Sequence, residues 1–577
     1  MIHRFLQRGE TVASLILAVL IGIATGFAAI GFRLLINFFK TAFFSGGQQV
    51  FAYLDKYYVI LIPVLGGLVV GPLTYFLARE AKGHGVPEVM AAVAEKGGVI
   101  RPRVVVVKSL ASAVCIGSGG SVGREGPIVQ IGSAVGSTVG QLFRVPTHRL
   151  RALVACGAAG GIAATFNAPI GGVLFALEVI LGEFSGGHLV LVIVAAVMAA
   201  VIGRIFLGDI PAFAVPAYPL ASPWELILYV CLGIVAGAFG ILYIKLLYKC
   251  EDWFDAIKNV PDYLKPAIGG LLVGAIGCFF PQVFGVGYES VEQALTGRLP
   301  LLLTATLLFM KLLATSLTIG SGGSGGVFAP SLFMGSMLGS TLGVLFHRLL
   351  PDIAQIPAAY ALVGMGAVFA GCAQAPMTAI IMLFEMSNDY RIILPLMIAC
   401  IISAAVARGL FPHSIYTMKL VRRGLDIDAA RLRDVLKHIP VREVMTRRVE
   451  TIPGHLSVKK AVRLVSKSRH QGFPVVDEHN RLTGIVTRYE LYSALRRDHG
   501  DRPVQSVASV NLILVTADES LSAAAAKLAR FDIGRLPVVE TPDDMCLVGI
   551  VTRSDILRAY GRTLQMRERP LVSAGAE

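Results

Sequence analysis

The chain has 577 residues, of which 55% are hydrophobic and 16% charged, whereas an average soluble domain is about 25% charged. This composition argues against an ordinary soluble enzyme. The net charge of +14 would favour a nucleic-acid partner in a soluble protein. Here arginine pairs lie in or beside the charged C-terminal part, which is typical of the cytoplasmic side of membrane proteins. We therefore expect membrane lipid, and no nucleic acid, as a partner.

Long apolar stretches occupy the first 410 residues. Those at residues 11–35, 58–77, 188–207 and 229–247 are comparable to the roughly 20 residues that span a bilayer. The first is too long for a signal-peptide core, so no cleavage is expected. The eight cysteines form no CxxC pair and lie mostly in apolar runs, which indicates small buried side chains and no metal site. We predict an all-α polytopic membrane domain over residues 1–420 that crosses the membrane many times.

The membrane domain contains an internal repeat. The segment GSGGSVGREGP at residues 117–127 recurs as GSGGSGGVFAP at residues 320–330, an offset of 203. Each copy is followed by an Ala-Pro pair with a glutamate nine residues after the proline, which is Glu178 in one copy and Glu385 in the other. The domain therefore consists of two related halves, about residues 10–215 and 220–410. Repeated halves are typical of transporters that bind substrate near the membrane midplane.

The glycine-rich motifs predict an anion site. Seven residues rich in glycine cannot form a stable helix, and Pro127 and Pro330 suit the first turn of a helix that follows. Two helix N-termini directed at one midplane position would bind an anion without lysine or arginine. The segment GHGVP at residues 83–87 is a third candidate. The alternative is that glycines allow close helix packing, which explains scattered residues such as Gly132 but not the repeated motif.

Few ionisable residues interrupt the apolar runs, and the clear ones are Glu125, Glu178 and Glu385. Such residues are functional candidates. Glu178 and Glu385 occupy equivalent repeat positions, which favours a structural role in capping backbone at a helix end. The repeat partner of Glu125 is Phe328, so the repeat requires no acid there. A carboxylate inside the anion-binding turn could occupy the site as a tethered anion and open the path when displaced or protonated.

Together, the motifs at residues 83–87, 123–127 and 326–330 and the late Tyr416 resemble those of the CLC family of chloride channels and transporters. The resemblance covers residues 15–420. It implies an inverted-repeat fold, a homodimer with one anion pathway per subunit, and Glu125 as the gate. It also implies a set of anion-binding residues, which are His84, Gly85, Val86, Gly123, Arg124, Gly126, Gly326, Val327, Phe328 and Tyr416.

Two positions depart from the family pattern. His84 stands where the family usually has a serine that contacts the central anion, so selectivity among anions stays open. Histidine could donate an N–H, bind better when protonated, or turn aside. Val179 stands where proton-coupled members generally carry a glutamate, and valine cannot relay a proton. We therefore favour channel-like chloride conduction, with a proton-coupled antiporter as the alternative.

The soluble region contains a second repeat. GIVTR at residues 484–488 recurs at residues 549–553, an offset of 65, and each copy follows a Pro-Val-Val segment. Short apolar runs and helical stretches predict two small α/β units that resemble a tandem CBS pair, in the cytoplasm. We place a linker at residues 421–439, the two motifs at 440–496 and 503–562, and a tail at 563–577.

The resemblance of the soluble region to CBS modules implies an adenine nucleotide as a candidate ligand, although no cofactor is required for transport. Thr552 and Asp555 match the usual phosphate and ribose contacts. Thr487 is the equivalent threonine of the first motif, where Glu490 fits the ribose pattern less well. The alternative is a purely structural module for dimerisation or tethering.

Two other classes compete with anion transport. A divalent-cation transporter with a CBS tail would need carboxylates or carbonyls converging on the pore, and magnesium uptake without chloride flux would support it. A soluble CBS-containing enzyme conflicts with the apolar runs and shows no nucleophile–base motif. We therefore expect a non-enzymatic, multi-pass protein of the cell membrane.

Overall fold

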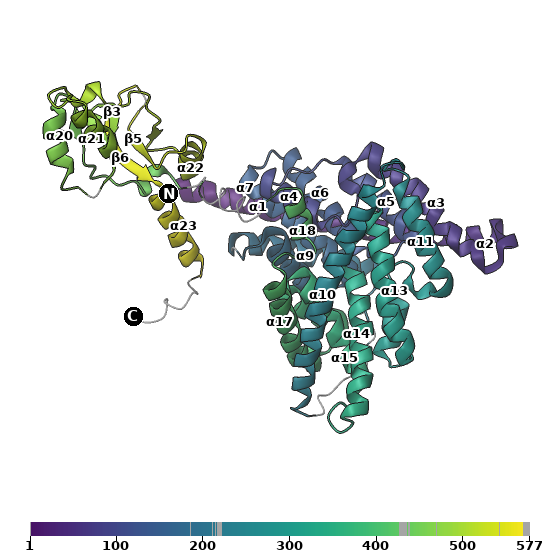
Figure 1. Ribbon diagram of the computed structural model, residues 1–577. Coiled ribbons are helices and arrows are strands. Elements are labelled where there is room, and N and C mark those ends of the chain that lie inside the picture. Colours follow the sequence, from purple (N-terminus) through teal and green to yellow (C-terminus); the bar gives the residue numbers. More distant parts are fainter. Residues whose placement is uncertain are drawn as a thin grey trace. The chain divides into compact units, whose positions relative to one another are not determined.

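The computed structural model describes residues 2–184, 186–209, 212–213, 215, 222–425, 436, 439–468, 470–541 and 543–568. The chain divides into two compact units, Met1–Leu425 and Asp426–Glu577. The first consists of helices and the second contains two small β-sheets with helices (Figure 1). Within the described residues, seven helices are long and apolar enough to cross a membrane. The chain is a multi-pass integral membrane protein with a C-terminal α/β unit.

The helices of the first unit form two similar series, as the repeat predicts. The first series comprises α1 (Ile2–Thr41), α3 (Tyr58–Pro72), α4 (Val86–Glu95), α5 (Arg103–Gly117), α6 (Glu125–Leu142), α7 (Thr147–Phe166), α8 (Pro169–Phe175) and α9 (Gly186–Leu207). The second comprises α10 (Glu225–Ala256), α11 (Lys265–Phe279), α12 (Tyr288–Leu295), α13 (Leu301–Gly320), α14 (Phe328–Leu349), α15 (Pro357–Ala373), α16 (Pro376–Ser387) and α17 (Ile393–Leu410). A short helix, α18 (Thr417–Arg422), completes the unit.

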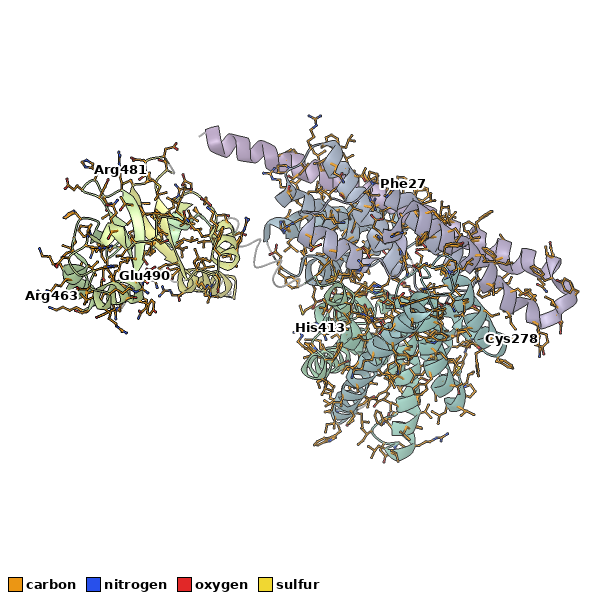
Figure 2. All side chains as sticks on the ribbon, turned by 45° about the horizontal axis from the view of Figure 1, so that its top comes forward. Phe27, Cys278, His413, Arg463, Arg481 and Glu490 are labelled. Atoms are coloured by element: carbon orange, nitrogen blue, oxygen red, sulfur yellow. The ribbon has the colours of Figure 1, made fainter. Side chains whose placement is uncertain are left out.

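The outer surfaces of the two units differ in character. Apolar side chains project from the membrane helices, as Phe27 does on α1 (Figure 2), where it is 49% exposed. Lipid solvates such side chains in a bilayer. The C-terminal unit instead presents charged side chains, including Arg463 and Arg481 (Figure 2). The two surfaces therefore suit hydrocarbon and water, respectively.

Glycines allow the closest helix contacts at equivalent places in the two halves. A Cβ atom on Gly132 of α6 would lie 2.1 Å from the Gly157 oxygen of α7, and one on Gly335 of α14 would lie 2.4 Å from the Gly364 oxygen of α15. Neither distance is possible for a real side chain. The small-residue packing expected of Gly132 is therefore confirmed, and it recurs across the repeat.

Glu178 and Glu385 cap helices in the opposite half of the repeat. Glu178 accepts hydrogen bonds from the Met377 and Thr378 N–H groups at 3.3 and 2.7 Å, at the start of α16. Glu385 accepts from Ile170 and Gly171 at 3.0 and 2.6 Å, at the start of α8. A carboxylate satisfies free N–H groups and complements the positive end of the helix dipole. The structural role predicted from their equivalent positions is confirmed.

The C-terminal unit contains two copies of one α/β motif. The first sheet has the order β1 (Ile452–Pro453), β2 (Gly472–Val476), β3 (Leu482–Thr487), and the second has β4 (Val515–Thr516), β5 (Arg535–Val539), β6 (Leu547–Thr552). In each sheet the first two strands are parallel and the last two antiparallel. The accompanying helices are α20 (Val458–Val465), α21 (Arg488–Arg496), α22 (Leu521–Arg530) and α23 (Arg553–Glu568).

Candidate functional site

Three glycine-rich loops meet where α4, α6 and α14 begin. Gly123 and Gly326 exchange two backbone hydrogen bonds of 2.8 and 2.6 Å. Gly83 donates to the Gly323 oxygen at 3.0 Å and so joins the third loop to them. The close approach of the loops also requires glycine at residue 126, because a Cβ atom on Gly126 would lie 2.2 Å from the His84 oxygen. The motifs that the sequence places far apart therefore start their helices side by side.

Glu125 is buried at the first position of α6, with 3% of its surface exposed. Its Oε2 atom accepts a hydrogen bond from the Ala329 N–H at 3.2 Å, in the first turn of α14. Its Oε1 atom accepts from the Tyr288 hydroxyl at 3.0 Å. N–H groups in a first helical turn lack intrahelical partners and attract anions. The carboxylate thus lies on the helix end where an external anion would bind.

A narrow cavity of about 10 Å³ lies beside Glu125, roughly the space that one water molecule needs. Seven of the residues proposed from the sequence line it, and these are His84, Val86, Glu125, Gly126, Val327, Phe328 and Tyr416. The lining is completed by three apolar side chains that no sequence motif indicated, which are Ile162, Phe175 and Met382. Gly85, Gly123 and Gly326 instead shape the loops around the cavity. An anion would have to be small and largely dehydrated to enter a cavity of this size.

His84 is buried and its two ring nitrogens differ in environment. Nε2 lies 3.4 Å from the Tyr248 hydroxyl, which donates its own proton to the Ile415 oxygen at 2.6 Å. The Tyr248 oxygen can therefore only accept from His84, which places a proton on Nε2. Nδ1 is buried and has no hydrogen-bond partner within the described structure. In the neutral ring this nitrogen is a bare acceptor, so it can donate to an anion only when the ring is protonated.

Arg124 points away from the narrow cavity. Its guanidinium lies over the rings of Phe166 and Tyr288, at 5.4 Å from each ring centroid. It lines two larger cavities on the Tyr288 side of Glu125, with volumes of about 400 and 250 Å³. We call these the outer cavities. The Arg124 side chain therefore lines the outer cavities with Tyr288, and not the narrow cavity that His84 lines.

Tyr288 was not among the residues predicted from the sequence. The signal was present: GVGY at residues 285–288 is the repeat copy of GHGV at residues 83–86. Gly85 and Gly287 both have φ near +80°, at 80° and 82°, and both precede the first residue of a helix. Val86 and Tyr288 are therefore equivalent, one beside the narrow cavity and the other on the gate carboxylate.

Two buried lysines were also missed. The sequence indicated Glu125, Glu178 and Glu385 as the clear ionisable groups at membrane depth. Lys108 and Lys311 are repeat equivalents and both are fully buried. Lys108 donates to the Ala81 and Gly83 oxygens at 3.0 and 2.8 Å. Lys311 donates to the Val283 and Gly285 oxygens at 2.9 and 2.8 Å. Each lysine therefore holds the glycine-rich loop of its own half, and neither lines the narrow cavity.

Two pairs of hydroxyl side chains also connect the loops of one half with those of the other. The Ser112 hydroxyl lies 2.9 Å from that of Ser324, and the Ser121 hydroxyl lies 3.2 Å from that of Thr315. Ser112 is equivalent to Thr315 and Ser121 to Ser324. The two halves thus fix each other's loops around a local twofold relation. Val179 is buried beside Glu178 and offers no titratable group.

The residues proposed for nucleotide binding lie at two equivalent strand–helix junctions. Thr552 ends β6, and both its N–H and its hydroxyl donate to Asp555 Oδ2, at 2.9 and 2.7 Å. Asp555 is buried and also pairs with Arg558. Thr487 and Glu490 form the corresponding capping box at the start of α21. These acids cap helices in the structure described here.

Family models match both units of the chain. A model described as "Voltage gated chloride channel" matches residues 66–408, and one described as "CBS domain" matches residues 441–497 and 504–562. The first match covers more than half of the chain.

Individual relatives point the same way. A "Putative chloride channel protein ClcB-like" of Ralstonia nicotianae is 37% identical over 71% of this chain and 96% of its own length. An "H(+)/Cl(-) exchange transporter ClcA" of Vibrio parahaemolyticus is 34% identical over 75% of this chain and 95% of its own. The solved structure of a slow cyanobacterial Cl⁻/H⁺ antiporter has a TM-score of 0.67 and 28% identity, and the match covers 71% and 97% of the two chains.

Proposed function

The chain belongs to the voltage-gated chloride channel family, known as the CLC family, and we infer that it carries chloride across the membrane along a path gated by Glu125. The observation that carries this inference is the position of the gate carboxylate. Glu125 Oε2 occupies the first turn of α14, where it accepts the Ala329 N–H. An anion that takes this place must displace the carboxylate, because helix N–H groups can bind one acceptor or the other.

The residues around the narrow cavity also favour an anion. The N-termini of α4, α6 and α14 meet around it, and each contributes a partial positive charge. Tyr416 and His84 line the cavity, whereas Tyr288 does not line it and binds the Glu125 carboxylate. Converging carboxylates, which a divalent cation would need, do not line the cavity, since Glu125 is the one acid among its lining residues.

We propose channel-like conduction, with proton-coupled exchange as the second candidate. Val179 is the argument for the channel, because a valine cannot pass a proton from the inner side to Glu125. The names of the relatives include both a channel and an exchanger, so the second candidate is kept. Chloride flux and proton flux must therefore be measured on the same protein.

The test is chloride efflux from liposomes that contain the full chain, with and without a proton gradient. We expect chloride efflux from the wild type, altered efflux from Glu125→Ala, and little uphill proton movement. Sustained proton uptake driven by a chloride gradient would favour the exchanger. Equal efflux from Glu125→Ala and the wild type would remove Glu125 as the gate, and absence of chloride efflux from the wild type would overturn chloride transport.

Three further assignments belong to this proposal. We propose a homodimer with one pathway per subunit, a place in the cell membrane, and a C-terminal unit that faces the cytoplasm.

We also propose that the Thr552–Asp555 junction binds an adenine nucleotide. Binding would require Asp555 to exchange its cap on Thr552 for a ribose hydroxyl. Titration of the full chain with ATP, compared with Asp555→Ala, tests this exchange.

A further inference from the structure

The two outer cavities have three lining residues in common, which are Arg33, Arg124 and Tyr288. Tyr288 donates a hydrogen bond to the Glu125 carboxylate, so both cavities reach a residue that contacts the gate. The larger, of about 400 Å³, has room for several water molecules or a hydrated anion. Both cavities are thus lined by Arg33 and Arg124. The smaller one is also lined by Arg204, which pairs with Asp209 at 3.3 Å.

Arg33 is unexpected in its own helix. It is the one charged residue between residues 11 and 39 of the sequence, in the apolar span formed by α1. A charge placed in a membrane helix is costly and is generally retained for a function or a partner. In the part of the chain that the structure describes, no carboxylate forms a salt bridge with Arg33. Its cost is therefore not offset by a protein acid.

Arg124 brings a second positive charge close to Arg33, and the two guanidinium groups interact electrostatically. The Arg124 Nε atom is buried without a hydrogen-bond partner among the described residues. Glu125 is attracted to Arg124, but both of its oxygens are already used by Tyr288 and Ala329. Two like charges facing shared cavities repel each other, and a bound anion would turn this repulsion into attraction.

The remaining charges of the larger cavity leave it positive. Lys40 and Glu289 also line it, and they form a long, exposed ion pair of 3.9 Å. The pair contributes no net charge, so the two arginines determine the sign of the cavity. Guanidinium groups bind anions well because they are planar, always charged and only weakly hydrated.

We propose that Arg33 and Arg124 form an additional anion-binding site that captures a small monovalent anion, such as a halide or nitrate, before it displaces Glu125. The site rests on the proposed function, since its ligand is the transported anion. Arg33 supplies a charge from α1, outside the glycine-rich motifs. The captured anion lies beside the ring of Tyr288, whose hydroxyl holds the gate, so capture and gate displacement occur at neighbouring atoms.

The experiment measures chloride flux into liposomes as a function of chloride concentration, for wild type, Arg33→Gln, Arg33→Lys and Arg298→Gln. Arg298 is an exposed arginine of the same unit that lines neither outer cavity. We expect the half-saturating chloride concentration to rise about tenfold in Arg33→Gln, as expected for loss of one charge-assisted contact. The maximal rate of Arg33→Gln, and both the maximal rate and the half-saturating concentration of Arg298→Gln, should remain within about twofold of wild type. Arg33→Lys keeps the charge but not the guanidinium, so its half-saturating concentration should rise less than that of Arg33→Gln.

A second measurement does not depend on flux. Crystals of the wild-type protein grown in bromide should show anomalous scattering between Arg33 and Arg124, and those of Arg33→Gln should not. No bromide there, or an unchanged half-saturating concentration in Arg33→Gln, overturns the site. A shift that appears only in liposomes rich in phosphatidylglycerol would assign the pair to a lipid phosphate and also overturn it. A wild type that binds bromide here but carries no chloride would contradict the proposed function alone.

Discussion

The Tyr288 hydroxyl donates a hydrogen bond of 3.0 Å to Oε1 of Glu125. It comes from the half of the repeat that carries no gate acid, and its ring lies beneath Arg124. Tyr288 therefore stabilises the carboxylate in the position that blocks the path. Displacement of the gate must break this bond as well as the contact with Ala329.

Replacement of Tyr288 by phenylalanine removes the hydroxyl and keeps the ring. A hydrogen bond to a charged group stabilises by about 1.5–3 kcal/mol, so the blocked state should become less populated. We predict chloride flux about tenfold higher in Tyr288→Phe at subsaturating chloride, measured in liposomes. The control is Tyr243→Phe, because the buried Tyr243 hydroxyl has no hydrogen-bond partner within the described residues. Equal effects of the two variants would show that Tyr288 does not hold the gate.

The buried lysines predict an unequal loss of stability. Lys311→Met leaves the Val283 and Gly285 oxygens without a donor, whereas after Lys108→Met the Ala81 and Gly83 oxygens keep the Ser324 hydroxyl and the Gly325 N–H. A buried acceptor left unpaired costs about 1–3 kcal/mol, so Lys311→Met should melt at clearly lower temperature than wild type and Lys108→Met should lose less. Thermal unfolding in detergent, with the exposed Lys245→Met as control, measures this. If one lysine variant is as stable as wild type, its loop does not depend on that lysine.

The helix caps exchanged between the halves give a third prediction. Glu178→Ala frees the first N–H groups of α16, and Glu385→Ala frees those of α8. Loss of a cap costs about 1 kcal/mol, so each variant should lose thermal stability while keeping the chloride-to-nitrate preference. Glu292→Ala, on the exposed surface of α12, is the matched control. A change in anion preference would mean that Glu178 or Glu385 contacts the path.

His84 predicts a proton-dependent anion affinity. Because Nδ1 can donate only from the protonated ring, anion and proton should bind together, and lower pH should raise the affinity for chloride. A bound anion would favour this protonation, because it would accept the hydrogen bond that Nδ1 then donates. In a Glu125→Ala background, which removes the gate as a titrating group, His84→Ser should make the chloride dependence of flux less sensitive to pH. His413→Ser is the control, and undiminished pH sensitivity in His84→Ser would exclude this role.

Much of the membrane unit could be predicted from the repeat. Gly117 and Gly320 end helices, and Pro127 and Pro330 lie in the first turns of α6 and α14, because glycine and proline restrict where a helix can run. The capping role of Glu178 and Glu385 was also predicted, although the exchange between halves was not. Sequence spacing shows equivalence, whereas the partner of a carboxylate depends on how the halves face each other.

The residues that escaped prediction share one property: their role depends on contacts between distant segments. Tyr288 is equivalent to Val86, but the copies differ in chemistry, which weakens the match of GVGY with GHGV. Ile162 and Met382 look like ordinary core residues in their helices. Arg124 lies in the recognised motif, yet only the rings of Phe166 and Tyr288 direct its side chain away from the narrow cavity.

The central claim is that the Glu125 carboxylate and the transported anion compete for the N-terminus of α14. Anomalous diffraction from Glu125→Ala crystals grown in bromide tests it most directly. We predict a bromide peak within hydrogen-bond distance of the Ala329 N–H, where Oε2 lies in the wild type, and a much weaker peak in wild-type crystals grown in the same way. A bromide peak of equal height at this position in both proteins, or no peak in Glu125→Ala, would contradict the account.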